Sequence, residues 1–336
     1  MSAPRRFFSA VMGLSVFLIM AACCLVPLDV ALARMGDEPL SYWNNTPAKQ
    51  RIIAFVDEVT DPLSDSYVAE EMRLAAFDLD GTLFCEKPLY LQVLVAAEGL
   101  YDLAEKDPTL REEYPYNGAW KRDMEFISDS KNFLEMNLTA FAGMTQEEYQ
   151  AYVRDFLRRD HPKYGVPYDQ LFYSPMEELL RFLRDNGFQI YLVSGSPQEF
   201  IRSFSVEILD VQPERVIGDT ISIDFEIRDG EVAYVRKHDY VKPEVLKAGK
   251  PVNIRLRTGR SPILAFGNSS DDIQMLESAG AGGLPSLALT LRHDDAEREY
   301  AYDKGAEKMI EVASENGWVI VSMKEDFKTV FENIDD

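Results

Sequence analysis

The chain has 336 residues, 46% hydrophobic and 27% charged, so it can bury a substantial core. Its formal net charge is −22, and a surface that acidic repels nucleic acid and anionic membranes, which excludes both as bulk partners. An anionic substrate would therefore need a locally positive site. The length fits either two domains or one large α/β domain with an insertion.

The first 33 residues, 1–33, have the pattern of an export signal. Arg5 and Arg6 precede a long apolar run and an A-x-A pattern at 31–33, as in a cleaved secretory signal peptide. Two alternatives fit the same residues. The run is long enough to stay as a single membrane anchor, and the segment MAAC ending at Cys23 resembles a bacterial lipoprotein box. We expect export to the periplasm or the cell exterior, with membrane contact only through this segment if it is uncleaved or lipidated.

Residues 34–73 form an N-terminal arm, in which Pro47 after a capping Thr46 predicts a short helix. The first predicted strand, RLAAFDLD, ends in two aspartates that are followed by Gly81 and Thr82. Two like charges at the end of a buried strand repel each other and are costly to desolvate, so Asp78 and Asp80 require compensation, such as a metal ion. Cys85, the one cysteine beyond the leader, cannot form an intrachain disulfide there, and we interpret it as a packing residue.

The segment 87–169 shows helical periodicity and no buried-strand pattern, so we interpret it as a helical cap inserted after the first strand. Thr145 and Glu148 predict a capping box at the start of one of its helices. Its aromatic residues suggest either a cage for a choline-like group or, as we favour, helical core packing. These residues are Tyr90, Tyr101, Tyr116, Trp120, Phe126, Phe133 and Phe141.

From residue 170 onward, predicted helices and strands alternate. Ser174 is expected to cap a helix, and residues 295–316 are predicted to be helical. Three apolar segments are predicted to be strands: QIYLVSG, SPILAFG and SLALTLRH. Asp229-Gly230 predicts a hairpin turn. His293 and Asp294 fit either the mouth of a site or an ordinary strand-to-helix junction. The alternation predicts an α/β fold: a doubly wound, Rossmann-like parallel sheet formed by residues 74–86 and 170–336.

Three of the predicted strands end in polar clusters: AAFDLD, IYLVSGS and ILAFGNSSDD. Ligands bind at the carboxyl ends of the strands in open parallel sheets. A lysine upstream of the last strand would supply a positive charge, and we assign this to Lys250 rather than to Lys242 or Lys247. The pattern then gathers five further side chains at one edge: Asp78, Asp80, Ser194, Asn268 and Asp272.

In this order, DLDGT, the strand-end serine, the lysine and a G-[DN]-x-x-x-D cluster resemble the haloacid dehalogenase-like phosphohydrolases. The insertion and the later hairpin resemble the phosphoserine-phosphatase-like branch, and the resemblance covers about residues 74 to 300. It implies Mg²⁺-dependent hydrolysis of a small phosphorylated substrate. A phosphotransferase of the same fold stays open, and so does a non-catalytic exported binding module, because the family commonly has aspartate at Asn268. A dehalogenase is disfavoured, because dehalogenation does not need the second aspartate, Asp80.

The resemblance also assigns roles to the residues. Asp78 would attack phosphorus to form an aspartyl-phosphate, and Asp80 would act as acid and then base. Ser194 and Lys250 would contact the phosphoryl group and complete the catalytic set. The implied Mg²⁺ ligands are Asp78, the Asp80 carbonyl, Asn268 and Asp272. The implied substrate contacts are Gly195, Ser196, Glu86 and Tyr90.

Overall fold

The computed structural model describes residues 39–334. The predicted leader at 1–33, with Cys23, lies outside the described residues. Within 39–334, none of the helices is both long and apolar enough to span a bilayer.

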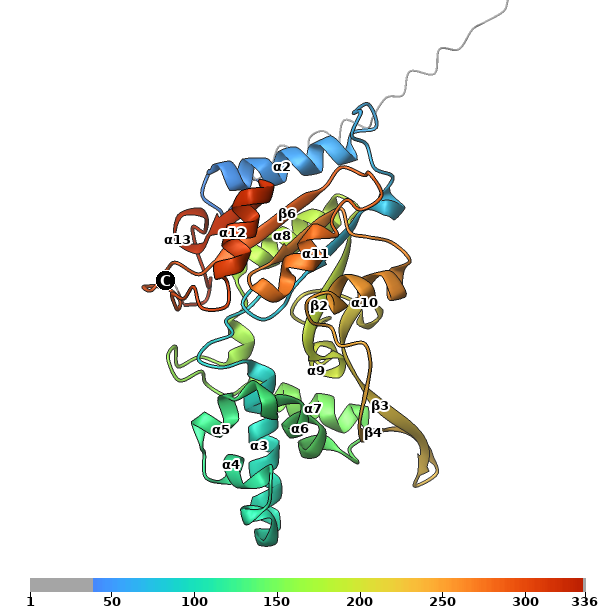
Figure 1. The fold of residues 1–336 in the computed structure, drawn as a ribbon, viewed down its shortest axis with the longest axis vertical. Coiled ribbons are helices and arrows are strands. Elements are labelled where there is room, and N and C mark those ends of the chain that lie inside the picture. Colours follow the sequence, from blue (N-terminus) through green and yellow to red (C-terminus); the bar gives the residue numbers. More distant parts are fainter. Residues whose placement is uncertain (1–38, 335–336) are drawn as a thin grey trace, which may run out of the picture. The chain divides into compact units, whose positions relative to one another are not determined.

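A seven-stranded sheet has the order β4-β3-β2-β1-β5-β6-β7 (Figure 1). All neighbouring strands are parallel except β3 and β4, which are antiparallel. The predicted doubly wound parallel sheet is confirmed, with β1 at its centre. The strands are β1 (Leu74–Phe77), β2 (Gln189–Pro197), β3 (Val216–Arg228), β4 (Glu231–Val241), β5 (Leu264–Gly267), β6 (Leu287–Arg292) and β7 (Val319–Ser322).

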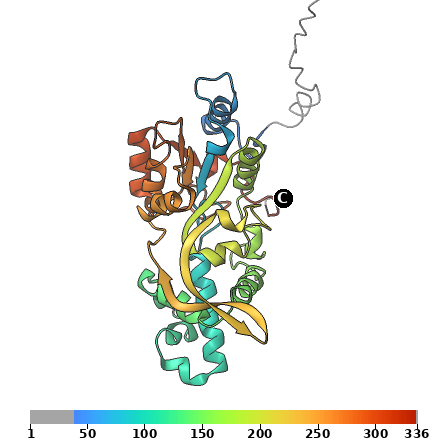
Figure 2. The ribbon, with the colours of Figure 1, turned by 90° about the vertical axis from the view of Figure 1, so that its right-hand side faces the viewer.

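Helices cover both faces of this sheet, and Figure 2 shows α8 and the α10–α12 region on opposite sides of it. Alternate residues of β1 enter two separate apolar clusters, one with α2 and α8 and the other with α10, α11 and α12. Strands buried on both faces read as continuous apolar runs, which is why the sequence revealed them. The helices are α2 (Pro47–Thr60), α8 (Ser174–Asp185), α9 (Gln198–Arg202), α10 (Gly249–Thr258), α11 (Ile273–Glu277), α12 (Glu307–Asn316) and α13 (Met323–Asp326).

Five α-helices lie inside the segment 87–169, and α7 begins with the predicted capping box. Several aromatic residues of this segment pack on one another: Tyr101 stacks on Trp120 at 5.0 Å, and Phe141 meets Tyr149 edge-on at 4.8 Å. We call α3–α7 the cap. Its helices are α3 (Leu91–Lys106), α4 (Tyr116–Trp120), α5 (Met124–Ser128), α6 (Ser130–Phe141) and α7 (Gln146–Leu157).

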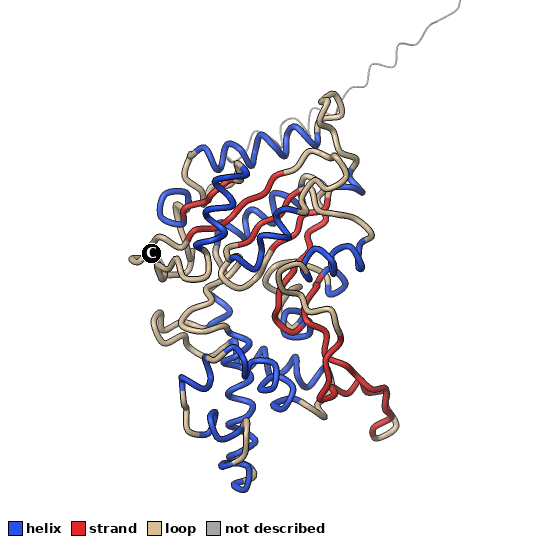
Figure 3. The backbone as a smooth tube through the Cα atoms, in the orientation of Figure 1, coloured by secondary structure: helices blue, strands red, loops and turns tan. Residues whose placement is uncertain are grey.

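The β3–β4 hairpin extends from the sheet toward the cap (Figure 3). Asp229 and Gly230 have φ values of 52° and 87°, so the predicted tight turn is confirmed. Near the cap, the Gly143 amide donates to the Arg236 carbonyl and the Arg236 amide donates to the Met144 carbonyl, both at 2.8 Å. The hairpin is therefore tied to the cap as well as to the sheet edge.

Two local expectations from residue 170 onward were wrong, and one strand was missed. Ser174 is the first residue of α8, and its hydroxyl accepts from the Glu332 amide at 2.9 Å instead of capping the helix. The helix predicted over 295–316 begins only at Glu307, because turns organised by the Asp295 carboxylate occupy its first part. The edge strand β7 was not predicted.

Candidate active site

The ends of β1, β2 and β5 bring the predicted site residues together. Asp78 directly follows β1, and its amide donates to the Phe266 carbonyl of β5 at 2.9 Å. Asn268 directly follows β5, and Ser194 lies near the end of β2. Parallel strands end at the same edge of the sheet, so these residues converge from distant parts of the chain, as predicted.

Lys250, the second residue of α10, bridges two buried carboxylates. Its Nζ lies 2.5 Å from Asp78 Oδ1 and 2.5 Å from Asp272 Oδ1. Burial lowers the pKa of Lys250, but Asp272 and Asp78 outweigh burial and raise it overall, so the ammonium stays charged. Burial and the nearby Asp272 raise the pKa of Asp78 to about 8.

The Asp80 carboxyl group is fixed on one side and free on the other. Its Oδ2 accepts from Ser194 Oγ at 3.1 Å and from Ser196 Oγ at 2.9 Å, while its buried Oδ1 has no hydrogen-bond partner. Burial and the charge of Glu86 raise the pKa of Asp80 to about 6, against the lowering effect of the two serines. An oriented carboxyl group with a pKa near neutrality is suited to proton transfer.

Thr82 and Asp272 organise the region where a cation was predicted. Thr82 Oγ1 lies 3.1 Å from Asp78 Oδ2 and 3.3 Å from Asn268 Oδ1. Asp272 Oδ2 accepts from the amides of Asn268 and Ser269, and its Oδ1 contacts Lys250. Both oxygens of Asp272 are thus engaged by protein donors. This geometry supports a positioning role for Asp272 rather than direct ligation.

Gly81 lies where no side chain fits. Its φ is +72°, and a Cβ atom at this position would lie 2.1 Å from Asn268 Nδ2. We expect Gly81→Ala to lower the free energy of unfolding by about 1–3 kcal/mol, because it adds both backbone strain and a clash. Urea unfolding measures this loss. Unchanged stability would contradict the close approach, and Gly143→Ala, where the added Cβ meets no atom within 4 Å, controls for backbone strain alone.

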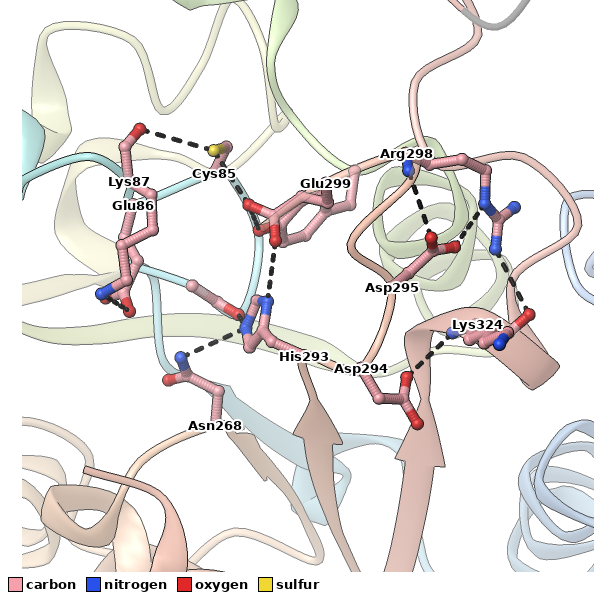
Figure 4. A network of polar contacts seen from close by, with 12 residues as sticks. Cys85, Glu86, Lys87, Asn268, His293, Asp294, Asp295, Arg298, Glu299 and Lys324 are labelled. Carbon is pink, nitrogen blue, oxygen red and sulfur yellow. Dashed lines mark hydrogen bonds and ion pairs between the residues drawn. The ribbon is translucent and has the colours of Figure 1, made fainter. Parts of the chain in front are cut away.

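A buried polar network lies behind this loop (Figure 4). His293 Nε2 is 2.7 Å from the Gly81 carbonyl, and its Nδ1 is 3.3 Å from Glu299 Oε2. Glu299 also accepts from the Cys85 thiol at 3.0 Å, so this cysteine has a polar contact in addition to its packing role. Asp294 instead accepts from Ser322 and from the Lys324 amide. Of the two residues whose place the sequence left open, His293 therefore supports the site and Asp294 belongs to the junction.

These groups open into a cavity of about 380 Å³ between the sheet edge and the cap. Every predicted site residue lines it except the fully buried Asp272. A cavity of about 430 Å³ beside Trp318 contains none of the predicted residues. Sequence reasoning missed several residues that line the active-site cavity, among them Asn137 of α6 and three residues at the base of the hairpin: Asp219, Tyr240 and Glu244.

The chain was compared with models of protein families and with curated proteins. A family model described as haloacid dehalogenase-like hydrolase matches residues 75–277, more than half of the chain. No curated protein matches.

Several solved structures are similar to this chain at low sequence identity. A conserved protein of unknown function from Anaerococcus prevotii DSM 20548 is 14% identical, with a TM-score of 0.55, and the match covers 87% of this chain and 98% of that one. A protein of unknown function from Bordetella pertussis Tohama I is 18% identical, with a TM-score of 0.47 and coverage of 74% and 97%. A phosphoserine phosphohydrolase-like protein from Francisella tularensis subsp. tularensis SCHU S4 is 18% identical, with a TM-score of 0.41 and coverage of 74% and 95%.

Proposed function

Because this chain belongs to the haloacid dehalogenase-like hydrolases, we propose that it is a Mg²⁺-dependent phosphomonoesterase that acts on a small phosphorylated metabolite. The observation that carries the proposal is the pairing of two carboxyl groups in different environments. Asp78 is held by Lys250 and Thr82, whereas Asp80 keeps one oxygen free. Two carboxyl groups whose surroundings differ in this way can act as nucleophile and proton donor.

The residues of the chain support a two-step reaction. Asp78 attacks phosphorus, the bond from phosphorus to the alcohol oxygen breaks, and Asp80 gives a proton to that oxygen. Asp80 then takes a proton from a water molecule, whose oxygen attacks phosphorus and releases Asp78. Lys250 holds Asp78 in position and adds positive charge beside the phosphoryl group. A phosphotransferase would differ only in using an alcohol instead of water.

The oxygen groups beside Asp78 fit a hard cation. Within 39–334, no three His, Cys, Asp or Glu side chains form a metal-binding group by themselves. A cation here would therefore also need the amide oxygen of Asn268 and the Asp80 carbonyl, both of which suit Mg²⁺. When bound, Mg²⁺ would neutralise phosphate charge that otherwise repels the nucleophile.

Phosphate release is the direct test of this function. The chain without residues 1–33, incubated with an aryl phosphate, should release phosphate with Mg²⁺ and lose this activity when a chelator is added. Binding of inorganic phosphate without turnover under any divalent metal would refute the proposal and select the binding module instead.

The Asn268 position tests the cation site separately. We expect Asn268→Asp to tighten Mg²⁺ binding by about tenfold, because a carboxylate adds charge to an oxygen ligand. Titration of Mg²⁺ followed by calorimetry measures this change. An unchanged Mg²⁺ affinity would remove residue 268 from the set of ligands.

The raised carboxyl pKa values predict that stability without metal depends on pH. Burial raises the pKa of Asp78 from 3.8 to about 8 and that of Asp80 from 3.8 to about 6. The folded state therefore binds more protons than the unfolded state in this window, and the free energy of unfolding should fall as the pH rises from about 4 to about 8. Mg²⁺ binds the ionised carboxylates, so it should raise the melting temperature more at the alkaline end. Thermal unfolding across this pH range, with and without Mg²⁺, checks both the pH dependence and the effect of Mg²⁺. If the metal-free protein became more stable as the pH rises, the raised pKa values of Asp78 and Asp80 would be contradicted.

We also propose that the enzyme works outside the cytoplasm, on the basis of the export pattern at 1–33. Fractionation of cells that express the full chain tests this proposal. Recovery of the protein only from the cytoplasm would refute it.

A further inference from the structure

The part of the cavity beyond the catalytic residues is strongly acidic. Among the residues that the structure describes, six carboxylates line the cavity, but only one ammonium group does, and no arginine. That ammonium belongs to Lys250, which is already engaged by Asp78 and Asp272. Besides Asp78 and Asp80, the cavity is therefore lined by four further carboxylates and by no second cationic side chain among the described residues.

Two of these carboxylates, Asp219 and Glu244, have no ion-pair partner among the residues that the structure describes. Asp219 lies on β3 and is held in place, because its Oδ1 accepts from the Val245 amide at 2.7 Å and from the Tyr240 hydroxyl at 3.3 Å. Burial is the main cause that raises the pKa of Asp219 to about 6, and the nearby Glu244 raises it further. A cation placed between Asp219 and Glu244 would relieve both effects.

The other two of the four further carboxylates, Glu86 and Asp271, are partly compensated. Glu86 pairs with Lys87 at 3.1 Å, and Asp271 has a longer contact of 3.8 Å with the exposed Lys247. Neither of these lysines lines the cavity. A negatively charged group on the substrate, other than its phosphate, would therefore find no cation to receive it.

Aromatic and amide groups also line the cavity. Tyr90 and Phe133 meet edge-on at 6.1 Å, and Tyr240 lies beside Asp219. Aromatic faces attract organic cations. Asn137 lines the cavity from α6: its Nδ2 donates to the Phe133 carbonyl at 3.0 Å, and its buried Oδ1 has no partner, so this oxygen is an unused acceptor beside the cavity.

We propose that the alcohol part of the substrate carries a positively charged nitrogen, so that the enzyme hydrolyses the phosphomonoester of an amino alcohol or of a quaternary ammonium alcohol. This inference rests on the proposed phosphatase function. The phosphate would occupy the Asp78 end, and the nitrogen would lie toward Asp219, Glu244 and the aromatic side chains. Among the predicted aromatic residues, only Tyr90 and Phe133 take part, and the rest do not line the cavity.

The test compares esters that differ in charge, among which phosphocholine and its tert-butyl analogue are matched in size. Phosphocholine and phosphoethanolamine are compared with the tert-butyl analogue of phosphocholine, in which a neutral carbon replaces the nitrogen, and with O-phosphoserine, which adds a carboxylate. We expect kcat/KM for at least one of the two cationic esters to exceed that for the neutral analogue by about tenfold or more, with O-phosphoserine below both cationic esters. A preference for phosphoethanolamine would indicate that the site recognises N–H donors. A preference for phosphocholine would indicate that the aromatic groups dominate recognition. Either preference supports the proposal. Equal or faster hydrolysis of the neutral analogue would overturn it.

Variants then locate the source of the preference. Asp219→Asn and Glu244→Gln should each reduce the ratio of kcat/KM for the cationic ester to that for the neutral ester by about three- to tenfold. A merely structural role would lower both values alike and leave this ratio unchanged, which would overturn the assignment. Glu231→Gln, at the exposed tip of the hairpin, is the matched control and should leave the ratio as in the wild type. If no ester is hydrolysed, the proposed function fails; calorimetric binding of phosphocholine against its neutral analogue still tests the charge preference by itself.

Discussion

Replacing Asp78 with asparagine is expected to lower kcat for phosphate release by at least about 10³-fold, because the amide cannot attack phosphorus. The shape of the side chain and its contact with Thr82 can be kept, so substrate should still bind. Steady-state kinetics on an aryl phosphate with saturating Mg²⁺ measures the loss. A variant with more than about a tenth of wild-type kcat would exclude Asp78 as the nucleophile.

The same substitution should not weaken the fold. Burial and Asp272 disfavour the ionised form of Asp78, so removal of its charge should leave the metal-free protein as stable as the wild type or more stable. Loss of activity with retained stability separates a catalytic role from a structural one. Asp65→Asn, in an exposed loop, is the control and should change neither quantity. A clear loss of stability in Asp78→Asn would show that the carboxylate serves the fold.

Local sequence was sufficient to predict most of the sheet and the convergence of the candidate site residues. The strands β1, β2 and β5 are apolar runs that stop at polar residues, and the topology of a parallel sheet then places Asp78, Ser194 and Asn268 at one edge. The same reasoning identified the hairpin turn at Asp229-Gly230, because its two positive φ values favour these residue types.

Contacts that depend on tertiary structure could not be predicted in this way. Ser194 and the amides near Ser196 were predicted to contact the phosphoryl group, and nothing in the sequence indicated that the hydroxyls of Ser194 and Ser196 also hold Asp80 in place. Asp272 has the spacing of a metal ligand, but loop amides and Lys250 occupy its oxygens. No periodicity or motif indicates which acidic residues of a hairpin will reach a cavity, and this is why Asp219 was missed.

Replacement of Lys250 is the second substitution for which we expect a large effect, on both stability and activity. Lys250→Met should lower the free energy of unfolding by about 3–5 kcal/mol, because it leaves two buried carboxylates without their shared cation. It should also lower kcat by about 10²- to 10³-fold, because Asp78 loses the group that holds it and the phosphoryl group loses a positive neighbour. Urea unfolding and steady-state kinetics measure these effects.

Lys247→Met is the matched control, since Lys247 lies three residues earlier and its side chain is 71% exposed, 3.8 Å from Asp271. It should change stability by less than about 0.5 kcal/mol. In the double variant Asp78→Asn/Lys250→Met, the ammonium is removed from a site that has already lost one carboxylate, so the stability loss should be smaller than the sum of the two single-variant changes by about 1 kcal/mol or more. Additive losses would show that Lys250 and Asp78 do not interact. A larger loss of stability in Lys247→Met than in Lys250→Met would show that Lys247 supplies the buried positive charge. The double variant should stay inactive in either case, because relief of the buried charge does not restore a nucleophile.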